Sequence, residues 1–199
     1  MRLSLTVLPA VRRLLLGVAV LPLAVACSSN GSGGQDAEAL NERKINEADI
    51  TDKQEADAKF LVRAASNALL EVELGKLAQA RATAPAVRAF GTDVVKSRLD
   101  LLAALRTLAA AKQLAVPSAL GDDEQSAYHE ASTQTGSQLD KRLMALLVKV
   151  QKQDEDAFDD MKDDAYDGDI RGLAAKYHAP LEEQLDAAKE AAEAAEKLP

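Results

Sequence analysis

Residues 60–78 read FLVRAASNALLEVELGKLA, and this stretch decides the fold class. Leu61, Ala65, Ala68 and Val72 follow one another at intervals of four, three and four residues, which is the spacing of one face of an α-helix. The stretch consists largely of alanine, leucine and glutamate, which are good helix formers. It therefore predicts a long amphipathic helix.

The same composition continues to the end of the chain and predicts four long helices. We place them at residues 54–83, 85–113, 138–164 and 170–197, with a short helix at 124–131. Thr83 and Pro85 are typical of a helix start, and Asp167 can cap the last helix. Helices of about 28 residues would be roughly 42 Å long, which is the scale of a four-helix bundle. The predicted fold is all-α, a four-helix bundle over residues 54–199 whose longer central connection allows a crossover.

The N-terminus has the pattern of a bacterial lipoprotein signal. Arg2, Arg12 and Arg13 and the apolar run 14–25 precede Cys27, the only cysteine in the chain, although Ala24 stands where such signals usually carry leucine. We expect removal of residues 1–26 and lipidation, such as palmitate, on Cys27. Ordinary secretory cleavage, which leaves a free thiol, is the alternative.

A lipid anchor would place the protein in the cell envelope. The expected location is the periplasmic face of the outer membrane in a Gram-negative bacterium, or the outer face of the plasma membrane in a Gram-positive or actinobacterial one. Residues 27–53 are rich in serine, glycine, asparagine and acidic residues and predict a flexible, disordered tether. Loss of residues 1–26 removes three of the 24 basic residues and no acidic one, which leaves 21 against 32, a net charge of −11. This charge argues against binding to nucleic acid.

Residues 60–197 resemble the ferritin-like family known as domain of unknown function 4142 (DUF4142). The resemblance rests on three motifs: Phe60-Leu61 with residues 71–78 (EVELGKLA); Leu139-Asp140 with Met144, residues 148–149 and Phe158; and Pro180 with Gln184-Leu185 and Ala188. Members of that family are often described as outer-membrane or secreted proteins. The resemblance implies a ferritin-like four-helix bundle in the envelope.

The chain departs from that family where the family tends to have histidine. Arg98, Gln151 and Gln184 stand at these positions, each on the predicted interior face of its helix. Carboxamides are poor ligands for transition metals, and a guanidinium repels a cation. The chain also lacks the Glu-x-x-His motif of four-helix di-iron proteins. The family's possible metal chemistry is therefore not carried over, and we predict no cofactor.

Arg98 on an interior face needs a partner, since an isolated buried charge is unfavourable by several kcal/mol. Glu71 shares a stripe with small residues on the first long helix, and Glu73 lies close by. We predict that Glu71 or Glu73 pairs with Arg98, while Gln151 or Gln184 accepts from the remaining guanidinium donors. The alternative is that Arg98 extends along its aliphatic stem to the surface.

Other candidate sites are weak. His129 and His178 are predicted at the surface, His178 within reach of Glu182, and the acidic run over residues 154–169 is predicted to be a solvated helix face rather than a calcium loop. No nucleophile triad or phosphate loop is present. We expect a protein that is not an enzyme, with a structural, stress-related or protein-binding role and an unidentified envelope partner. The alternative is a degenerate ferritin-like metal-binding or oxidoreductase protein that uses Glu71, Glu73 and the acidic run.

Overall fold

The computed structural model describes residues 33–47 and 52–198, so the predicted signal peptide and Cys27 lie outside the described residues. The all-α prediction is confirmed over the described residues, which form helices and no strand. The helices are α1 (Gly33–Glu47), α2 (Asp52–Arg81), α3 (Pro85–Ala111), α4 (Asp122–Ser132), α5 (Gly136–Asp164) and α6 (Gly168–Glu196). The described part of the chain thus contains six helices rather than the five predicted.

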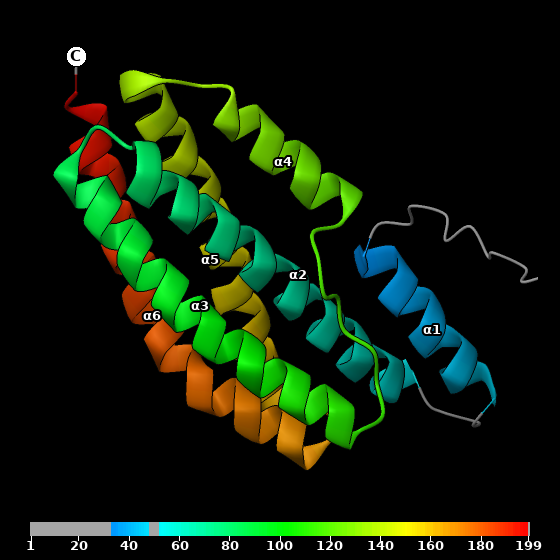
Figure 1. The fold of residues 1–199 in the computed structure, drawn as a ribbon. Helices are drawn as coiled ribbons and strands as arrows, with labels where there is room; N and C mark the ends of the chain where they lie inside the picture. Colours follow the sequence, from blue (N-terminus) through cyan, green and yellow to red (C-terminus); the bar gives the residue numbers. More distant parts are fainter. Residues whose placement is uncertain (1–32, 48–51, 199) are drawn as a thin grey trace, which may run out of the picture.

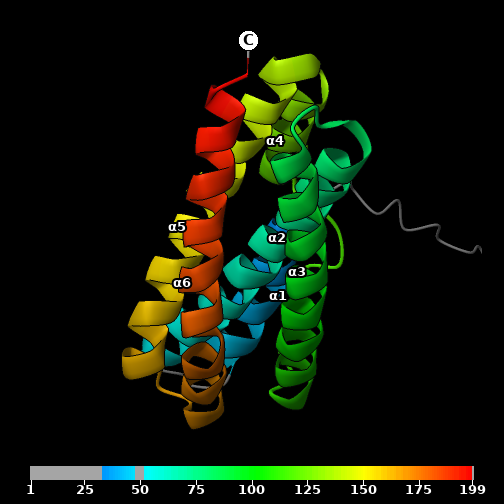
Figure 2. The same cartoon turned by 90° about the vertical axis from the view of Figure 1, so that its left-hand side faces the viewer.

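Four long helices, α2, α3, α5 and α6, run side by side (Figures 1 and 2). Helix α2 packs against α3 and α5, and α6 packs against the same two helices, so α2 and α6 lie on opposite corners. The short helix α4 belongs to the connection between α3 and α5 and packs on α2 and α5. This connection is the crossover that the sequence allowed.

Helix α1 shows that the prediction of a disordered tether through residue 53 is wrong over residues 33–47. It packs on the outer side of α2, where Ala37 and Asn41 are buried. The amide of Asn41 donates to the carbonyl of Ala115 at 3.0 Å and accepts from its N–H at 2.9 Å. Asn41 thereby satisfies the backbone of an irregular segment, as a neighbouring strand would.

The core consists of two apolar clusters along the long helices. One contains Leu74, Phe90, Leu143 and Leu147, and the other contains Leu61, Leu101, Phe158 and Leu181, together with many buried alanines. At roughly 25 cal/mol per Å² of apolar surface buried, such clusters are the main source of stability. Arg98 lies between the two clusters along α3, after Val94 of the first and before Leu101 of the second.

Two helical hairpins, α2–α3 and α5–α6, repeat each other with an offset of 83 residues. Asp140 lies 83 residues after Asp57, and both are buried. The carboxylate of Asp140 accepts from the backbone N–H groups of residues 83 and 84, at 2.8 and 2.6 Å. Asp57 accepts from those of residues 166 and 167, at 3.1 and 2.7 Å. Each hairpin therefore binds the turn of the other.

The same offset relates two arginines in the first turns of α3 and α6. Arg88 donates to the carbonyls of residues 82 and 83, and Arg171 donates to those of residues 165 and 166. These bonds satisfy carbonyls that the preceding helix leaves free at its end. The two hairpins are thus pseudo-equivalent. The turn of each hairpin is bonded by an arginine of the same hairpin and by an aspartate of the other.

Helices α2 and α3 approach each other closely at two glycines. A Cβ atom on Gly75 would lie 2.9 Å from the carbonyl oxygen of Gly91, and one on Gly91 would lie 2.8 Å from that of Gly75. Neither position has room for a side chain unless a backbone shifts. This contact brings the two helices together about one turn from Glu71, which favours short bonds between α2 and α3.

Candidate functional site

Glu71 and Arg98 form an ion pair inside the protein. Glu71 lies on the inward face of α2 and is 0 % exposed, while Arg98 comes from the facing side of α3 and is 2 % exposed. Arg98 Nε donates to Glu71 Oε1 at 2.8 Å. A charge-assisted bond of this length away from water is among the stronger contacts available to side chains.

Gln151 brings α5 into the same cluster. It is fully buried, and its Nε2 donates to the second oxygen of Glu71, Oε2, at 2.8 Å. Both oxygens of Glu71 are therefore bonded, one to α3 and one to α5. Because α3 and α5 lie on opposite corners, Glu71 connects two helices that have few direct contacts with each other.

Asp154, one turn after Gln151 on α5, is the second carboxyl of the cluster. It is buried and accepts from Asn67 Nδ2 at 2.6 Å. Burial raises the pKa of Asp154 well above its usual range, and the negative charge of Glu71 raises it further. Arg98 and the Asn67 bond act in the opposite direction without cancelling the rise in this pKa.

The charge balance of the cluster leads to the same conclusion. Arg98 is the one cation within the buried cluster, and Glu71 already neutralises it. A second ionised carboxylate beside Glu71 would leave a net negative charge out of water. This charge balance and the raised pKa both favour the protonated form of Asp154.

Two of the predicted network residues lie elsewhere. Glu73 is partly exposed and pairs with Lys76 at 2.7 Å, because a step of two residues turns it away from the interior face. Gln184 exchanges hydrogen bonds with Ser97, at 2.7 and 3.0 Å, in a half-buried position between α3 and α6. The proposed roles of Glu73 and Gln184 in the buried network are therefore wrong.

The alternative prediction, that the Arg98 side chain extends to the surface, is also wrong, since this side chain is only 3 % exposed. The prediction that a glutamine accepts from the remaining guanidinium donors fails as well: Gln151 is present, but it donates to Glu71. Within the described residues, Arg98 Nη2, Gln151 Oε1 and Asp154 Oδ2 are buried without a hydrogen-bond partner. These three atoms could therefore form further hydrogen bonds within the cluster.

The donor set of the cluster does not fit a transition metal. It offers Glu71, Asp154 with its raised pKa, a carboxamide and a guanidinium, with no imidazole or thiolate. The guanidinium occupies the place beside Glu71 that a cation would take, and it cannot lose its charge. Over residues 33–47 and 52–198, no group of three or more histidine, cysteine or acidic side chains has a metal-binding arrangement.

His178 has a different partner from the one expected. Its Nε2 lies 3.0 Å from Asp159 Oδ1 and 3.6 Å from Glu155 Oε1, both on α5, and no bond to Glu182 is formed. The side chain is 18 % exposed, so it is partly covered rather than free at the surface. His129 is exposed on α4, as predicted.

Sequence reasoning missed Asp154 because it belongs to an acidic run that was predicted to be solvated. The helical period alone places Asp154 on the stripe of Val150 and Phe158, which are buried. The 83-residue offset gives the same result, since Asp154 is the equivalent of Glu71 in the second hairpin. Either signal would have separated Asp154 from the rest of the run.

The described chain is an all-helical protein with a buried ion-pair cluster between its long helices, and this cluster contains no histidine. The family model of Domain of unknown function (DUF4142) matches residues 43–191. The chain belongs to that family. No match was found among curated proteins. Nor did any solved structure match the chain.

The described helices do not meet the requirements of a membrane span. None of those within residues 33–47 and 52–198 is both long enough and apolar enough to cross a bilayer.

Proposed function

We propose that this protein is a lipid-anchored envelope protein whose domain is a non-catalytic, ferritin-like four-helix bundle with a structural, stress-related or protein-binding role. The observation that carries this proposal is the buried pair of Arg98 with Glu71. The guanidinium of Arg98 occupies the central position that a metal ion would take, so the charge of Glu71 is neutralised by a side chain of the protein itself. Membership of the DUF4142 family is compatible with the proposal but assigns no activity.

The anchor is the second part of the proposal, and its support comes from the sequence. Cys27 follows a cationic and apolar leader, and the described domain begins a few residues later with α1. Two or three acyl chains would attach the protein to a membrane almost permanently, whereas a single chain would not. Residues 54–199 would then carry the bundle, at the periplasmic face of an outer membrane or the outer face of a plasma membrane.

The alternative function is a degenerate ferritin-like metal-binding or oxidoreductase protein. Glu71 and Asp154 favour it, since they are buried carboxyls at equivalent positions of the two hairpins. Two carboxylates at a bundle centre are part of the ligand set of di-iron proteins. Against it stands Arg98, which holds one of these carboxyls in an ion pair.

Metal analysis of the purified chain separates the two functions. The chain from Ser28 onward, which contains all described helices, would be expressed with added iron, manganese or zinc and then dialysed. The proposed function expects no stoichiometric metal in the wild-type protein. Retention of about one or two ions per chain, lost in Glu71→Gln, would establish the alternative.

A further inference from the structure

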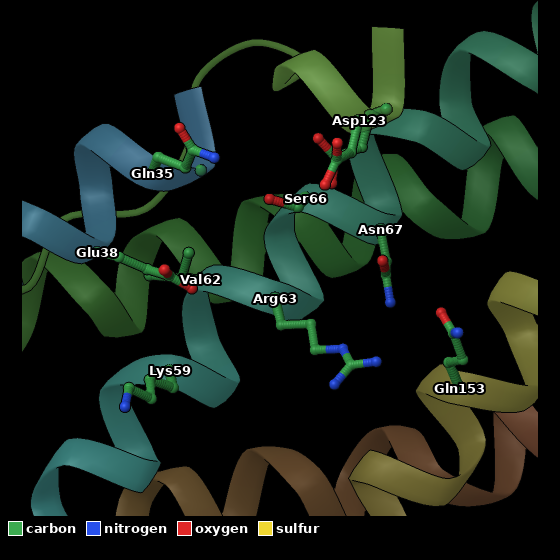
Figure 3. Close-up of a pocket in the computed structure, with 11 residues that line it drawn as sticks. Gln35, Glu38, Lys59, Val62, Arg63, Ser66, Asn67, Asp123 and Gln153 are labelled. Atoms are coloured by element: carbon green, nitrogen blue, oxygen red, sulfur yellow. The ribbon is translucent and has the colours of Figure 1, made fainter. Parts of the chain in front are cut away.

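A polar hollow of about 520 Å³ lies outside the buried cluster, where α1 and α4 leave part of α2 uncovered (Figure 3). Its floor is one face of α2, which contributes residues 59, 62, 63, 66 and 67. One side is formed by Gly34, Gln35 and Glu38 of α1 and by Asp123 and Glu124 of α4. Gln153 of α5 closes the other side. A hollow of this volume suits a small molecule.

The floor offers two polar groups that the protein leaves free. Ser66 and Asn67 are 7 % and 9 % exposed, yet within the described residues no hydrogen bond engages Ser66 Oγ or Asn67 Oδ1. Neither oxygen is among the fully enclosed atoms that lack a partner, and both residues line the hollow. Nearly buried polar groups without a protein partner are normally satisfied by something else.

The charged side chains around the hollow that lack an ion pair are separated by sign, since Lys59, the other cation of its lining, pairs with Glu55. Arg63 projects from α2 and, in Figure 3, lies with Asn67 and Gln153 on the side of α5. The carboxylates of Glu38, Asp123 and Glu124 come from α1 and α4 on the other side. Among the described residues, no ion pair engages Arg63, Asp123 or Glu124. The two sets of charge face one space without neutralising each other.

We propose that this hollow binds a small zwitterion, an amino acid or short peptide, across the face of α2. Its carboxylate is bound by the Arg63 guanidinium with help from Gln153, and its ammonium by Asp123 and Glu124. The free oxygens of Ser66 and Asn67 accept from its remaining donors. A ligand of one sign would satisfy only one side and leave the opposite charges unpaired beside it.

The ligand would also be coupled to the buried cluster through Asn67. Asn67 lines the hollow and donates its Nδ2 to Asp154 at 2.6 Å. A bond from the ligand to Asn67 Oδ1 fixes the orientation of this amide and thereby the donor to Asp154. The site is therefore connected to the interior by one side chain, although binding itself needs no change in the cluster.

Isothermal titration calorimetry tests the site, using the chain from Ser28 onward. The probes are zwitterions of increasing charge separation, namely glycine, 4-aminobutyrate, glycylglycine and 6-aminohexanoate, with succinate and putrescine as ligands of one sign. We expect at least one zwitterion to bind and both single-sign ligands to bind at least tenfold more weakly. Binding by none of the zwitterions, or equal binding of succinate or putrescine, would overturn the proposal.

Variants then locate the bound ligand. Arg63→Gln and Asp123→Asn should each weaken binding by about tenfold or more, since each removes a charge-assisted bond. Arg106→Gln and Asp160→Asn, exposed substitutions of the same kind outside the hollow, should leave affinity within about twofold. The amide of the best ligand, which lacks the carboxylate, should not distinguish wild type from Arg63→Gln. An affinity that Arg63→Gln does not change contradicts the assignment.

Discussion

Replacing Arg98 by methionine should destabilise the protein strongly, because it leaves Glu71 ionised and buried without its cation. Removing one member of a buried ion pair typically costs about 3–5 kcal/mol. For a domain of this size, each kcal/mol corresponds to roughly 2–4 °C in melting temperature. We therefore expect Arg98→Met to lower the melting temperature by roughly 6–20 °C at pH 7.

The two members of the pair should contribute unequally. The converse variant, Glu71→Gln, should be milder, because Asp154 can lose its proton and become the carboxylate that faces Arg98. Combining Glu71→Gln with Asp154→Asn removes that substitute and should restore the full loss.

The assay is urea unfolding followed by circular dichroism, for wild type, both single variants and Glu71→Gln/Arg98→Met. The double variant buries no charge from the pair and should recover most of the stability lost in Arg98→Met, with a coupling of about 2 kcal/mol or more. Arg106→Met, on the exposed side of α3, is the control and should change stability by less than about 0.5 kcal/mol. A loss below about 1 kcal/mol in Arg98→Met, or additive variants, would refute the reasoning.

Three further outcomes follow from other parts of the chain. In Asp154, the raised pKa means that the folded state holds a proton that the unfolded chain releases above about pH 4. The protonated Asp154 contributes fully to the free energy of unfolding below that pH. This contribution is lost as the pH rises toward the folded-state pKa, by roughly 1–1.5 kcal/mol per pH unit. Asp154→Asn should remove this pH dependence of the free energy of unfolding, measured by urea unfolding. Asp140→Ala leaves the N–H groups of Thr83 and Ala84 without acceptors in a partly buried turn and should lower stability by about 2–4 kcal/mol, whereas Asp140→Asn should lose less; equal stability of all three proteins would contradict this. Cys27→Ser should release the protein from the membrane fraction or leave it as precursor in cell fractionation, and a processed variant that stays in the membrane would contradict lipidation.

The helix positions could be predicted from the sequence because the spacing of apolar residues and the residues that begin or end a helix are local features. The observed bounds of the long helices lie within two residues of the predicted ones. The pair of Glu71 with Arg98 was also within reach, since an arginine on an interior stripe requires an anion. Glu71 could even have been preferred over Glu73, because Ala68 and Gly75 place it on the stripe that faces inward.

The rest depended on contacts between residues far apart in the chain. Helix α1 has a polar composition and is held by Asn41, whose partner Ala115 lies 74 residues away. Asp57 and Asp140 lie within the first two turns of their helices and bind turns in the opposite hairpin. Nothing in their local sequence indicates these partners. Only a comparison of the chain with itself at the 83-residue offset points to them.

The central claim, that a fixed ion pair closes the bundle without metal, is tested most directly by thermal unfolding of the chain from Ser28 onward with and without a chelator, alongside elemental analysis of the same sample. Arg98 already satisfies Glu71, so removal of free metal should change nothing. We predict metal well below one ion per chain and a melting temperature that the chelator leaves unchanged within about 1 °C. A stoichiometric divalent ion, with a fall of several degrees on chelation that the same ion reverses, would contradict the claim.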